Sequence, residues 1–429
     1  MREPEELGER RKLPPARRVR RVRVEKSGRV SLPAPLARKL GANPGDRIEI
    51  VEERGRIELR PNIHSLARLY IEPTSRCNLT CQTCIRNTWE ERLGDMDEKT
   101  FERLVVQLAR FPHLESVMFG GFGEPLAHPA IVDMVRAVKS LGLRVEMTTN
   151  GTLLQGAMLE GLVRSGLDRL WVSFDGADEA RFESIRRGAR FRSVVGNLER
   201  LQKLNKKRKR PLAVGIAFVV MKKNIDDLVA MDELARSIGA DRIIVSNVLP
   251  YSPEMEKEML CQLTLTTDTF TFAPGKTEMS LPRLDISPYT REAILRLLRG
   301  YMNLSIMGSS ISAPSRSCRF VAERATFIRW GGRVSPCMGL LHPYKTYLYG
   351  NERHVTDYSL GDIGHKTLRS IWNSKEYRAF RERVRAFDFS PCHICGGCSL
   401  VEENKEDCYG NAFPACGACL WAQGVIQCP

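Results

Sequence analysis

Residues 72–89 read EPTSRCNLTCQTCIRNTW and contain three cysteines, Cys77, Cys81 and Cys84, separated by three and then by two residues. No fourth thiol stands beside them. A structural zinc site needs four ligands, usually as two C-x-x-C-like pairs. A four-iron cluster also normally takes four thiolates, so three local thiolates on such a cluster would leave one iron open to a substrate or a cofactor.

The cysteines follow the first of six apolar, β-rich segments that alternate with helical patterns such as AIVDMVRAVKSLG at 130–142 and IDDLVAMDELARSIG at 225–239. Since no two strands are joined by a tight turn, the order predicts an α/β fold with a parallel sheet, either doubly wound or a partial barrel. Polar and glycine residues follow the strands, at the edge where such folds place their sites. The expected strands are 68–73, 116–121, 144–151, 169–176, 212–220 and 242–250.

The C-x-x-x-C-x-x-C triplet after a first strand, within a six-unit βα series, resembles the radical SAM superfamily. The resemblance implies a partial (β/α)6 barrel of the TIM type, in which the three cysteines hold a 4Fe-4S cluster and S-adenosylmethionine binds its open iron through amino and carboxylate groups. GGFGEP at 120–125 is similar to the segment that holds the amino group. TTNG at 148–151 and SFDG at 173–176 are similar to the polar edge that meets the carboxylate and ribose. The cofactor-binding residues implied are Gly121, Gly123, Glu124, Thr149, Asn150, Ser173, Asp175 and Asn247.

One position departs from the family pattern. Members usually carry an aromatic residue just before the third cysteine, to pack on the adenine, and this chain has Thr83. Adenine contacts are therefore expected elsewhere, around Val219 or Asn247. The implied reaction transfers an electron from the reduced cluster to the sulfonium and yields methionine and a 5'-deoxyadenosyl radical, which abstracts hydrogen from a substrate, while the protein contributes placement and water exclusion. Asp175 is the candidate catalytic base, and a solvated strand-end aspartate is the alternative.

Nine further cysteines lie from residue 318 to residue 428. CRFVAERATFIRWGGRVSPC at 318–337 and CHICGGC at 392–398 resemble the SPASM extension, which holds auxiliary iron-sulfur clusters in radical SAM maturases. The later spacing departs from the family's C-x-x-C-x5-C-x3-C, so the assignment of thiols to clusters stays open. Nine thiols could fill two four-thiolate clusters with one left over, and zinc ribbons are the alternative. The candidate ligands are Cys318, Cys337, Cys392, Cys395, Cys398, Cys408, Cys416, Cys419 and Cys428, whereas the isolated Cys261 is expected to be a buried or free thiol.

The N-terminal residues 18–62 are expected to form a small separate unit. RRVRVEKSGRVSLP at 20–33 predicts a broken strand, APLARKLG at 34–41 a short helix, and NPGDRIEIVEERGRIELRP at 43–61 a hairpin. This order resembles the SpoVT-AbrB family of swapped-hairpin dimers and implies a homodimer. In that family basic residues often reach DNA, and a dimerisation or docking module without a DNA role is the alternative. The corresponding residues are Arg18, Arg20, Arg21, Arg23 and Arg29.

Composition limits the class of protein. A content of 42% hydrophobic and 27% charged residues excludes disorder of the chain as a whole. The net charge of +15 invites a nucleic-acid interpretation, but the basic run at 203–211 is favoured as a solvated helix end. Because the sequence has neither an apolar run of about 18 residues nor an export signal at its start, we expect a cytoplasmic protein without membrane contact. In the cytoplasm, C-x-x-C pairs favour metal ligation over disulfides.

The predicted function is a radical SAM maturase that modifies a protein, a peptide or a protein-bound cofactor, with an electron donor such as ferredoxin or flavodoxin. The architecture and the ending CGACLWAQGVIQCP resemble the maturases associated with tungsten-cofactor oxidoreductases. A sulfatase-type or peptide-modifying maturase is one alternative, and an iron-sulfur DNA-binding regulator, which would need no SAM pocket, is another. The expected segments are a basic flexible tail at 1–17, the N-terminal unit at 18–62, the barrel at 63–251, an insert at 252–314 and the cysteine-rich domain at 315–429.

Overall fold

The computed structural model divides into two compact units, residues 1–62 and 63–429. The described residues are 26, 30–43, 48–53, 56–261, 278–281, 287–298, 303–306, 309–310, 318–390, 392 and 398–429. Cys395 and the five arginines that the sequence nominates for DNA contact therefore lie outside the described residues.

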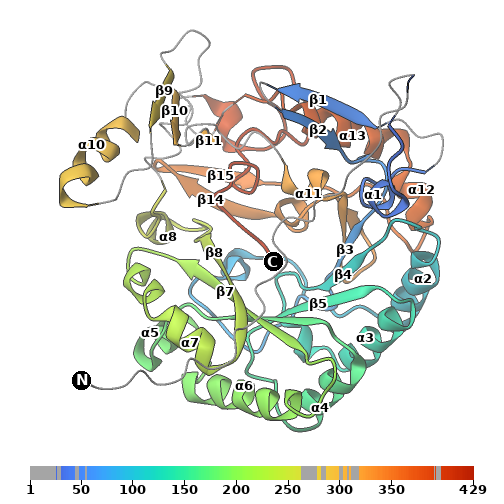
Figure 1. The fold of residues 1–429 in the computed structure, drawn as a ribbon, viewed down its shortest axis with the longest axis vertical. Coiled ribbons are helices and arrows are strands. Elements are labelled where there is room, and N and C mark those ends of the chain that lie inside the picture. The colour runs from blue at the N-terminus through green and yellow to red at the C-terminus, as the bar shows by residue number, and fades with distance from the viewer. Residues whose placement is uncertain are drawn as a thin grey trace. The chain divides into compact units, whose positions relative to one another are not determined.

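The larger unit is built on an eight-stranded sheet in which six parallel strands follow one another in chain order (Figure 1). A doubly wound sheet reverses its strand order at a switch point. This sheet does not, so of the two predicted architectures the partial barrel is the correct one, and all six predicted strands are confirmed. The strands are β3 (Arg68–Ile71), β4 (Ser116–Phe119), β5 (Arg144–Thr149), β6 (Arg169–Ser173), β7 (Ala213–Val220) and β8 (Ala240–Asn247).

Two strands from the cysteine-rich region extend this sheet beyond β3. β12 (Ala325–Ile328) pairs with β3 in parallel, and β13 (Val334–Ser335) pairs with β12 in antiparallel. The ring of Phe327 on β12 stacks on that of Tyr70 on β3, with centroids 4.2 Å apart. The strand that leads into the cysteine triplet therefore belongs to the same sheet as the beginning of the cysteine-rich region.

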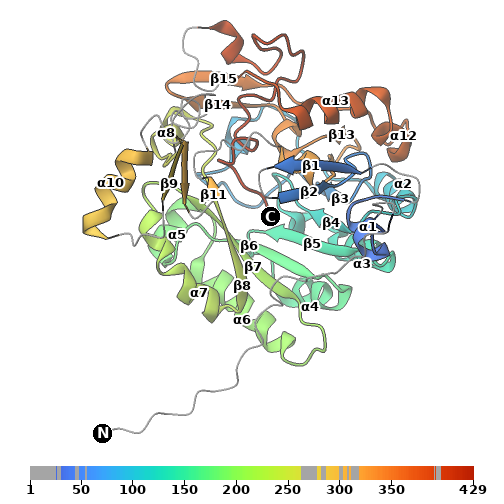
Figure 2. The ribbon, with the colours of Figure 1, turned by 45° about the horizontal axis from the view of Figure 1, so that its top comes forward.

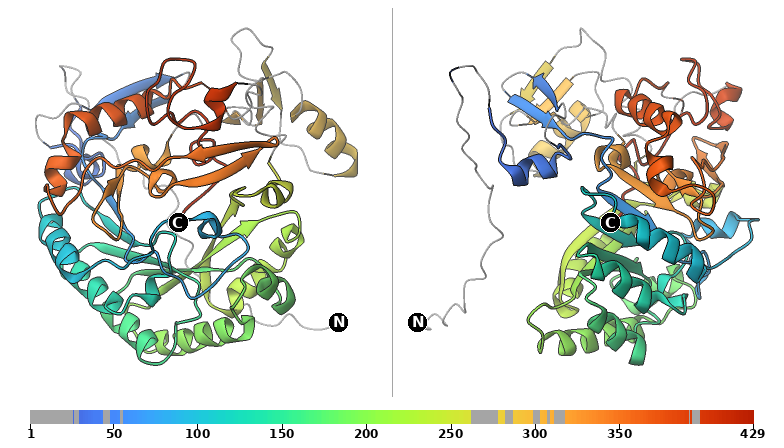
Figure 3. Two further views of the ribbon diagram at one scale, coloured as in Figure 1. Left: turned by 180° about the vertical axis from the view of Figure 1, so that it is seen from behind. Right: turned by 90° about the vertical axis from the view of Figure 1, so that its right-hand side faces the viewer.

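Helices form a layer on the outer side of the barrel strands (Figures 1 and 3). α3 shows why they pack there, because its buried residues Ile131, Met134, Val135 and Val138 recur at the spacing of one helical face. The helix predicted at 225–239 is split into a 3-10 turn, η3 (Ile225–Leu228), and α7. The helices of this layer are α2 (Glu98–Leu108), α3 (Ile131–Ser140), α4 (Gly156–Ser165), α5 (Glu179–Ile185), α6 (Phe191–Asn205) and α7 (Met231–Ser237).

The segment expected as an insert contains regular structure, although its sequence shows no clear period. β9 and β10 pair in parallel and β10 and β11 pair in antiparallel, with α10 between β9 and β10 in the chain (yellow in Figure 2). The strands have only two to four residues each, too few for a periodic pattern to be read. Its elements are α8 (Pro253–Lys257), β9 (Glu278–Leu281), α10 (Pro288–Leu298), β10 (Asn303–Ile306) and β11 (Ser309–Ser310).

The rest of the cysteine-rich region is made of short helices and one hairpin. Its core includes Arg381, which is 1% exposed and lies over the rings of Trp372 and Tyr377. None of the helices in the described part of the chain is long and apolar enough to cross a membrane. The elements are α11 (Arg319–Ala322), η4 (Met338–Leu340), β14 (Tyr344–Leu348), β15 (Asn351–Val355), α12 (Leu368–Trp372), α13 (Lys375–Ala386) and η6 (Ser399–Glu402).

The smaller unit contains the predicted short helix and hairpin. α1 (Ala34–Lys39) is followed by Gly41 with a φ of +65°, and β1 (Glu49–Glu53) pairs in antiparallel with β2 (Arg56–Arg60). The register places Ile50 and Ile57 on the same face of the hairpin, where they are 65% and 72% exposed. The exchange of hairpins between two chains stays a prediction.

Candidate active site

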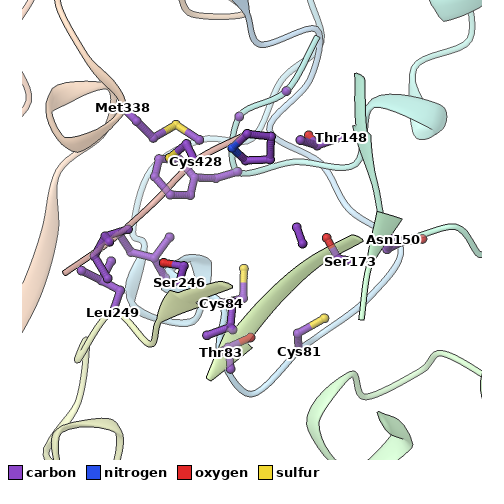
Figure 4. A pocket seen from close by; sticks show the side chains of 18 of the residues that line it. Cys81, Thr83, Cys84, Thr148, Asn150, Ser173, Ser246, Leu249, Met338 and Cys428 are labelled. Atoms are coloured by element: carbon purple, nitrogen blue, oxygen red, sulfur yellow. The ribbon is translucent and has the colours of Figure 1, made fainter. Parts of the chain in front are cut away.

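A cavity of about 300 Å³, called here the barrel cavity, lies at the C-terminal ends of the barrel strands. Residues from β3 to β8 and from the loops that follow them line it, as parallel α/β folds lead one to expect. Figure 4 shows Cys81 and Cys84 on one side of the open space and Met338 and Cys428 on another. The barrel cavity is therefore bordered by both the cysteine triplet and the cysteine-rich region.

The three thiols of the triplet all line the barrel cavity. The segment that carries them is fixed by backbone hydrogen bonds to the end of α5 and the residues that follow it, from Gln82 N to Ile185 O at 2.7 Å and from Thr80 N to Arg187 O at 3.2 Å. Burial raises the pKa of Cys81 to about 11 and raises that of Cys84 as well. These thiols stay protonated unless a metal centre draws off the proton, which is the behaviour of thiol ligands.

The described residues contain no group of three His, Cys, Asp or Glu side chains arranged to hold a single metal ion. A four-iron cluster takes its thiolates on separate irons, so its ligands need not converge on one point. Three partly buried thiols that border one cavity fit such a cluster better than they fit a single zinc ion.

Arg186 places a buried positive charge at the barrel cavity, and the sequence analysis did not single it out. Its side chain is 10% exposed and lies 2.9 Å from the fully buried carboxylate of Asp175. Burial alone would lower the pKa of Arg186, but Asp175 and then the three thiols of the triplet raise it. The Nε atom of Arg186 has no hydrogen-bond partner in the described chain. A free donor and a fixed positive charge beside the thiols fit the carboxylate of an amino-acid-like cofactor.

Asp175 itself is held inside the protein. Its Oδ1 accepts a hydrogen bond from Val219 N at 2.9 Å. Its Oδ2 forms the ion pair with Arg186, although the geometry of this contact is not that of a hydrogen bond. Asp175 is 0% exposed and is not among the described residues that line the barrel cavity. The solvated strand-end aspartate considered from sequence is therefore not what the structure contains.

The glycines of GGFGEP allow the loop after β4 to approach the chain after β3 closely. Gly121 has a φ of +142°, and a Cβ there would lie 2.7 Å from Glu72 Cγ. A Cβ on Gly123 would lie 2.1 Å from Thr74 O. Both glycines line the barrel cavity, and any larger residue would push the loop away from the chain after β3.

Glu124, the charged residue of that loop, accepts its hydrogen bonds from other groups of the protein. Its carboxylate accepts from Thr149 Oγ1 and Asn150 N, each at 2.7 Å, and from Leu126 N at 3.0 Å. Burial nevertheless raises its pKa. Asn150 in turn donates to Asn78 Oδ1 at 2.9 Å. Glu124 thus ties the loop to the end of β5 and to the residue after Cys77.

The remaining candidates lie on the far strands. Ser173, Val219 and Asn247 all line the barrel cavity. The backbone N–H and the side-chain amide of Asn247 both donate to Val425 O, at 3.2 and 3.1 Å. The chain at 425–429 consequently runs along β8 and borders the cavity, a contact that no local sequence pattern indicates.

The auxiliary candidates separate into groups. Cys318, Cys337, Cys416 and Cys419 line one small cavity of about 50 Å³, called here the second cavity. Burial raises the pKa of Cys318 to about 12. It also raises the pKa values of the other three thiols. Cys318, Cys337 and the C-x-x-C pair Cys416 and Cys419 follow one another along the sequence at intervals of about 20 and about 80 positions, and the fold brings these three parts of the chain together.

The other auxiliary candidates lie elsewhere. Burial raises the pKa of Cys392, and the nearby thiol of Cys408 makes a smaller contribution in the same direction. Cys398 is exposed. Cys428 lines the barrel cavity and accepts a hydrogen bond from Trp421 Nε1 at 3.2 Å. Cys261 is partly buried, with its pKa raised to about 11 by burial.

Comparison with known families assigns three segments of the chain. Residues 71–235 match the radical SAM superfamily, residues 318–399 match SPASM, described as an iron-sulfur cluster-binding domain, and residues 21–64 match the MazE bacterial antitoxin family of antidote-toxin recognition.

Two curated relatives and one solved structure illustrate the similarity. The tungsten-containing aldehyde ferredoxin oxidoreductase cofactor-modifying protein of Pyrococcus furiosus is 32% identical over 84% of this chain and 96% of its own length. A PqqA peptide cyclase of Gluconobacter oxydans is 26% identical over 84% of this chain and 92% of its own. SuiB of Streptococcus suis, solved with S-adenosylmethionine, is 19% identical with a TM-score of 0.50, covering 80% of this chain and 73% of its own, which supports the same fold.

Proposed function

The chain belongs to the radical SAM superfamily, and on this premise we propose that it is a maturase whose target is the cofactor of a tungsten-dependent oxidoreductase. It is an enzyme that uses a 4Fe-4S cluster and S-adenosylmethionine, and it carries a SPASM iron-sulfur cluster-binding domain. The observation that carries the narrower proposal is the 32% identity to the Pyrococcus furiosus cofactor-modifying protein along 96% of that protein's length.

When bound, the cluster supplies an electron that cleaves S-adenosylmethionine and so provides the radical for hydrogen abstraction. We assign Cys77, Cys81 and Cys84 to hold this cluster, because their thiols share the wall of the barrel cavity. The role of this chain is then to bind and orient the cofactor and the substrate and to keep water out of the barrel cavity.

Charge and hydrogen-bonding capacity suggest how the protein orients the cofactor. The free Nε–H of Arg186 and its fixed positive charge would hold the carboxylate, and the backbone of Gly121 and Gly123 would border the amino group. Ser173 and Asn150 would meet the carboxylate or ribose. Val219 and Asn247, in place of an aromatic residue at Thr83, would border the adenine.

Thiol positions also support a division of the auxiliary ligands. We assign Cys318, Cys337, Cys416 and Cys419 to one auxiliary cluster because they line the second cavity. Cys392, Cys408, Cys398 and Cys395 are then the candidates for another, although Cys395 lies outside the described residues. The proposal leaves Cys428 as the ninth thiol, at the wall of the barrel cavity.

The partners follow from the same chemistry. Reductive cleavage needs a low-potential electron donor such as ferredoxin or flavodoxin. The exposed Ile50 and Ile57 on one face of the N-terminal hairpin support a homodimer through that unit. DNA binding by the same unit is the alternative to docking, and the radical SAM match disfavours a regulator that only senses redox state.

The test is to incubate the anaerobically reconstituted enzyme with S-adenosylmethionine, dithionite and an immature tungsten oxidoreductase of the aldehyde ferredoxin oxidoreductase type. We expect 5'-deoxyadenosine to form together with a mass change in the cofactor extracted from the oxidoreductase. Deoxyadenosine formed with an unchanged cofactor, but with a modified peptide in a parallel assay, would favour the peptide-modifying alternative.

A further inference from the structure

A buried imidazole from the cysteine-rich region lies between two carboxylates of the barrel. His342 Nε2 is 2.9 Å from Glu72 Oε2, and His342 Nδ1 is 2.6 Å from Glu91 Oε2. The side chains of His342 and Glu72 are each 1% exposed. Glu72 directly follows β3, and Glu91 lies seven residues after Cys84, the last cysteine of the triplet. The ring of His342 therefore connects the cysteine-rich region to the end of β3 and to the chain after the triplet.

The two contacts determine the charge of the ring. A carboxylate accepts hydrogen bonds and does not donate them, so both ring nitrogens can be satisfied only when both carry a proton. Burial alone would lower the pKa of His342, but the hydrogen bonds to Glu72 and then to Glu91 raise it. The charged groups next to this place are Arg329, which pairs with Glu91 at 2.9 Å, and Asp357, which lies 3.9 Å from Arg329 and 2.9 Å from Arg333.

Aromatic rings close the site from the remaining sides. Trp89 stacks on His342 with centroids 4.2 Å apart and an interplanar angle of 24°. Phe122 meets both rings edge-on, at 5.5 Å from Trp89 and 5.9 Å from His342. The imidazolium is thus shielded from water, and its ion pairs are stronger than exposed ones would be.

Glu72, which His342 holds in place, also contacts the loop at 120–123. Its Oε1 accepts a hydrogen bond from Phe122 N at 3.3 Å and lies near Gly121, where a Cβ would be 2.8 Å away from it. Gly121 and Phe122 both line the barrel cavity. A Glu72 side chain released from His342 would be free to turn, and the loop that rests on it would lose its support.

We propose that His342 is a positioning residue through which the cysteine-rich region fixes the loop at 120–123 and thereby sets the affinity for S-adenosylmethionine. The proposal rests on the assignment of this loop to the cofactor. The ring does not touch the cofactor, and it acts as a charged clamp on Glu72.

The test compares four variants with the unaltered full-length protein, each with clusters reconstituted and iron counted, by anaerobic calorimetric titration with S-adenosylmethionine. His342→Leu removes both hydrogen bonds and should raise the dissociation constant about 10- to 100-fold, the range typical when a residue that orients a binding group is lost. His342→Gln should also bind weakly, because its amide can donate to one carboxylate while its oxygen faces the other.

The combination of His342→Gln with Glu91→Gln should restore binding. The new amide at 91 can donate to the oxygen of the new amide at 342, whose own N–H group then donates to Glu72. The net charge is also kept, since one cation and two anions become a single anion. His354→Gln is the matched control, because His354 is a surface imidazole 2.8 Å from a single carboxylate, Glu352.

The expected pattern is a loss of affinity in both single variants, recovery to within about threefold in the double variant and no change in the control. The KM for S-adenosylmethionine should rise more than kcat falls. Unchanged affinity in His342→Leu, or no recovery in the double variant while its iron content is normal, overturns the proposal. Absence of binding by the unaltered protein would instead contradict the assignment of the barrel cavity.

Discussion

Two sets of thiols in this protein differ in how the chain brings them together. Cys77, Cys81 and Cys84 lie on one short segment after β3, whereas Cys318, Cys337, Cys416 and Cys419 come from separate parts of the chain and meet at the second cavity. The first set can be recognised by its spacing because its geometry is local. The second depends on β12 joining the barrel sheet and on the chain returning after α13, so spacing alone does not define it.

The difference predicts that the local set can be removed without disturbing the other. Replacing Cys77, Cys81 and Cys84 together by Ala should abolish reductive cleavage of S-adenosylmethionine, because no iron with an open position remains. The iron of the cysteine-rich region, about two thirds of the total if three four-iron clusters are present, should stay bound. Deoxyadenosine formation with dithionite in the absence of oxygen, measured by chromatography, checks this. Turnover by the triple variant would refute the assignment.

The dispersed set should behave differently when one member is lost. Cys416→Ala should lower the iron content by about four atoms, from about twelve to about eight per chain, while deoxyadenosine formation continues. Cys261→Ala, which alters a partly buried thiol outside both groups, is the control and should change neither quantity. Zinc at about two equivalents with a single four-iron cluster would instead identify the cysteine-rich region as structural.

Arg186 connects the triplet to a buried carboxylate and offers a finer test of the barrel side. Arg186→Met should weaken S-adenosylmethionine binding roughly 10- to 100-fold through loss of a charge-assisted hydrogen bond. It should also lower the free energy of unfolding by about 3–5 kcal/mol, because Asp175 is left as an uncompensated buried charge. Adding Asp175→Asn should recover stability in a denaturant titration but not the affinity. Recovery of both would show that Arg186 has only a structural role.

The ion pairs of His342 should make the affinity for S-adenosylmethionine depend on pH. Because the folded protein raises the pKa of His342 above its ordinary value of 6.5, its contribution is complete below about pH 6.5 and is lost as the pH rises through the raised value. The affinity for S-adenosylmethionine should therefore fall on the alkaline side in the unaltered protein. The variant with glutamine at both 342 and 91 should lose less affinity over the same range. Parallel pH profiles for the two proteins would contradict this.

The same contrast explains what could be predicted from sequence. The six strands and the proximity of GGFGEP to the triplet follow from alternation of elements and from the rule that sites lie where parallel strands end. Alternation alone left a doubly wound sheet and a partial barrel open, and the resemblance to the radical SAM superfamily implied the barrel. Arg186 and His342 do not, because their partners are set by packing. His342 and Glu72 are 270 positions apart, and a lone histidine carries no local sign of two carboxylate neighbours. The second cavity was missed for the same reason, since only the fold reveals which of nine thiols share it.

The smallest effect on chemistry is expected from the N-terminal unit, whose role is separable from that of either set of thiols. A variant that begins at Ile63 keeps every residue assigned to the cofactor, so its rate of S-adenosylmethionine cleavage should match that of the full chain. It should be a monomer, since the exposed Ile50 and Ile57 are removed with the hairpin.

Charge reversal at Arg18, Arg20, Arg21 and Arg23 should leave the dimer intact, because dimerisation through an apolar face does not depend on these charges. If the unit binds DNA, the affinity should be lost in this variant and should fall steeply with added salt in the full chain, since phosphate contacts release counterions. Light scattering, turnover and binding to duplex DNA, measured on both variants, separate the two roles. A truncated protein that remains dimeric and fully modifies its natural partner would remove the reason for a docking role. Tight, sequence-selective DNA binding by the full chain would instead favour a regulatory role for this unit, added to the chemistry of the barrel.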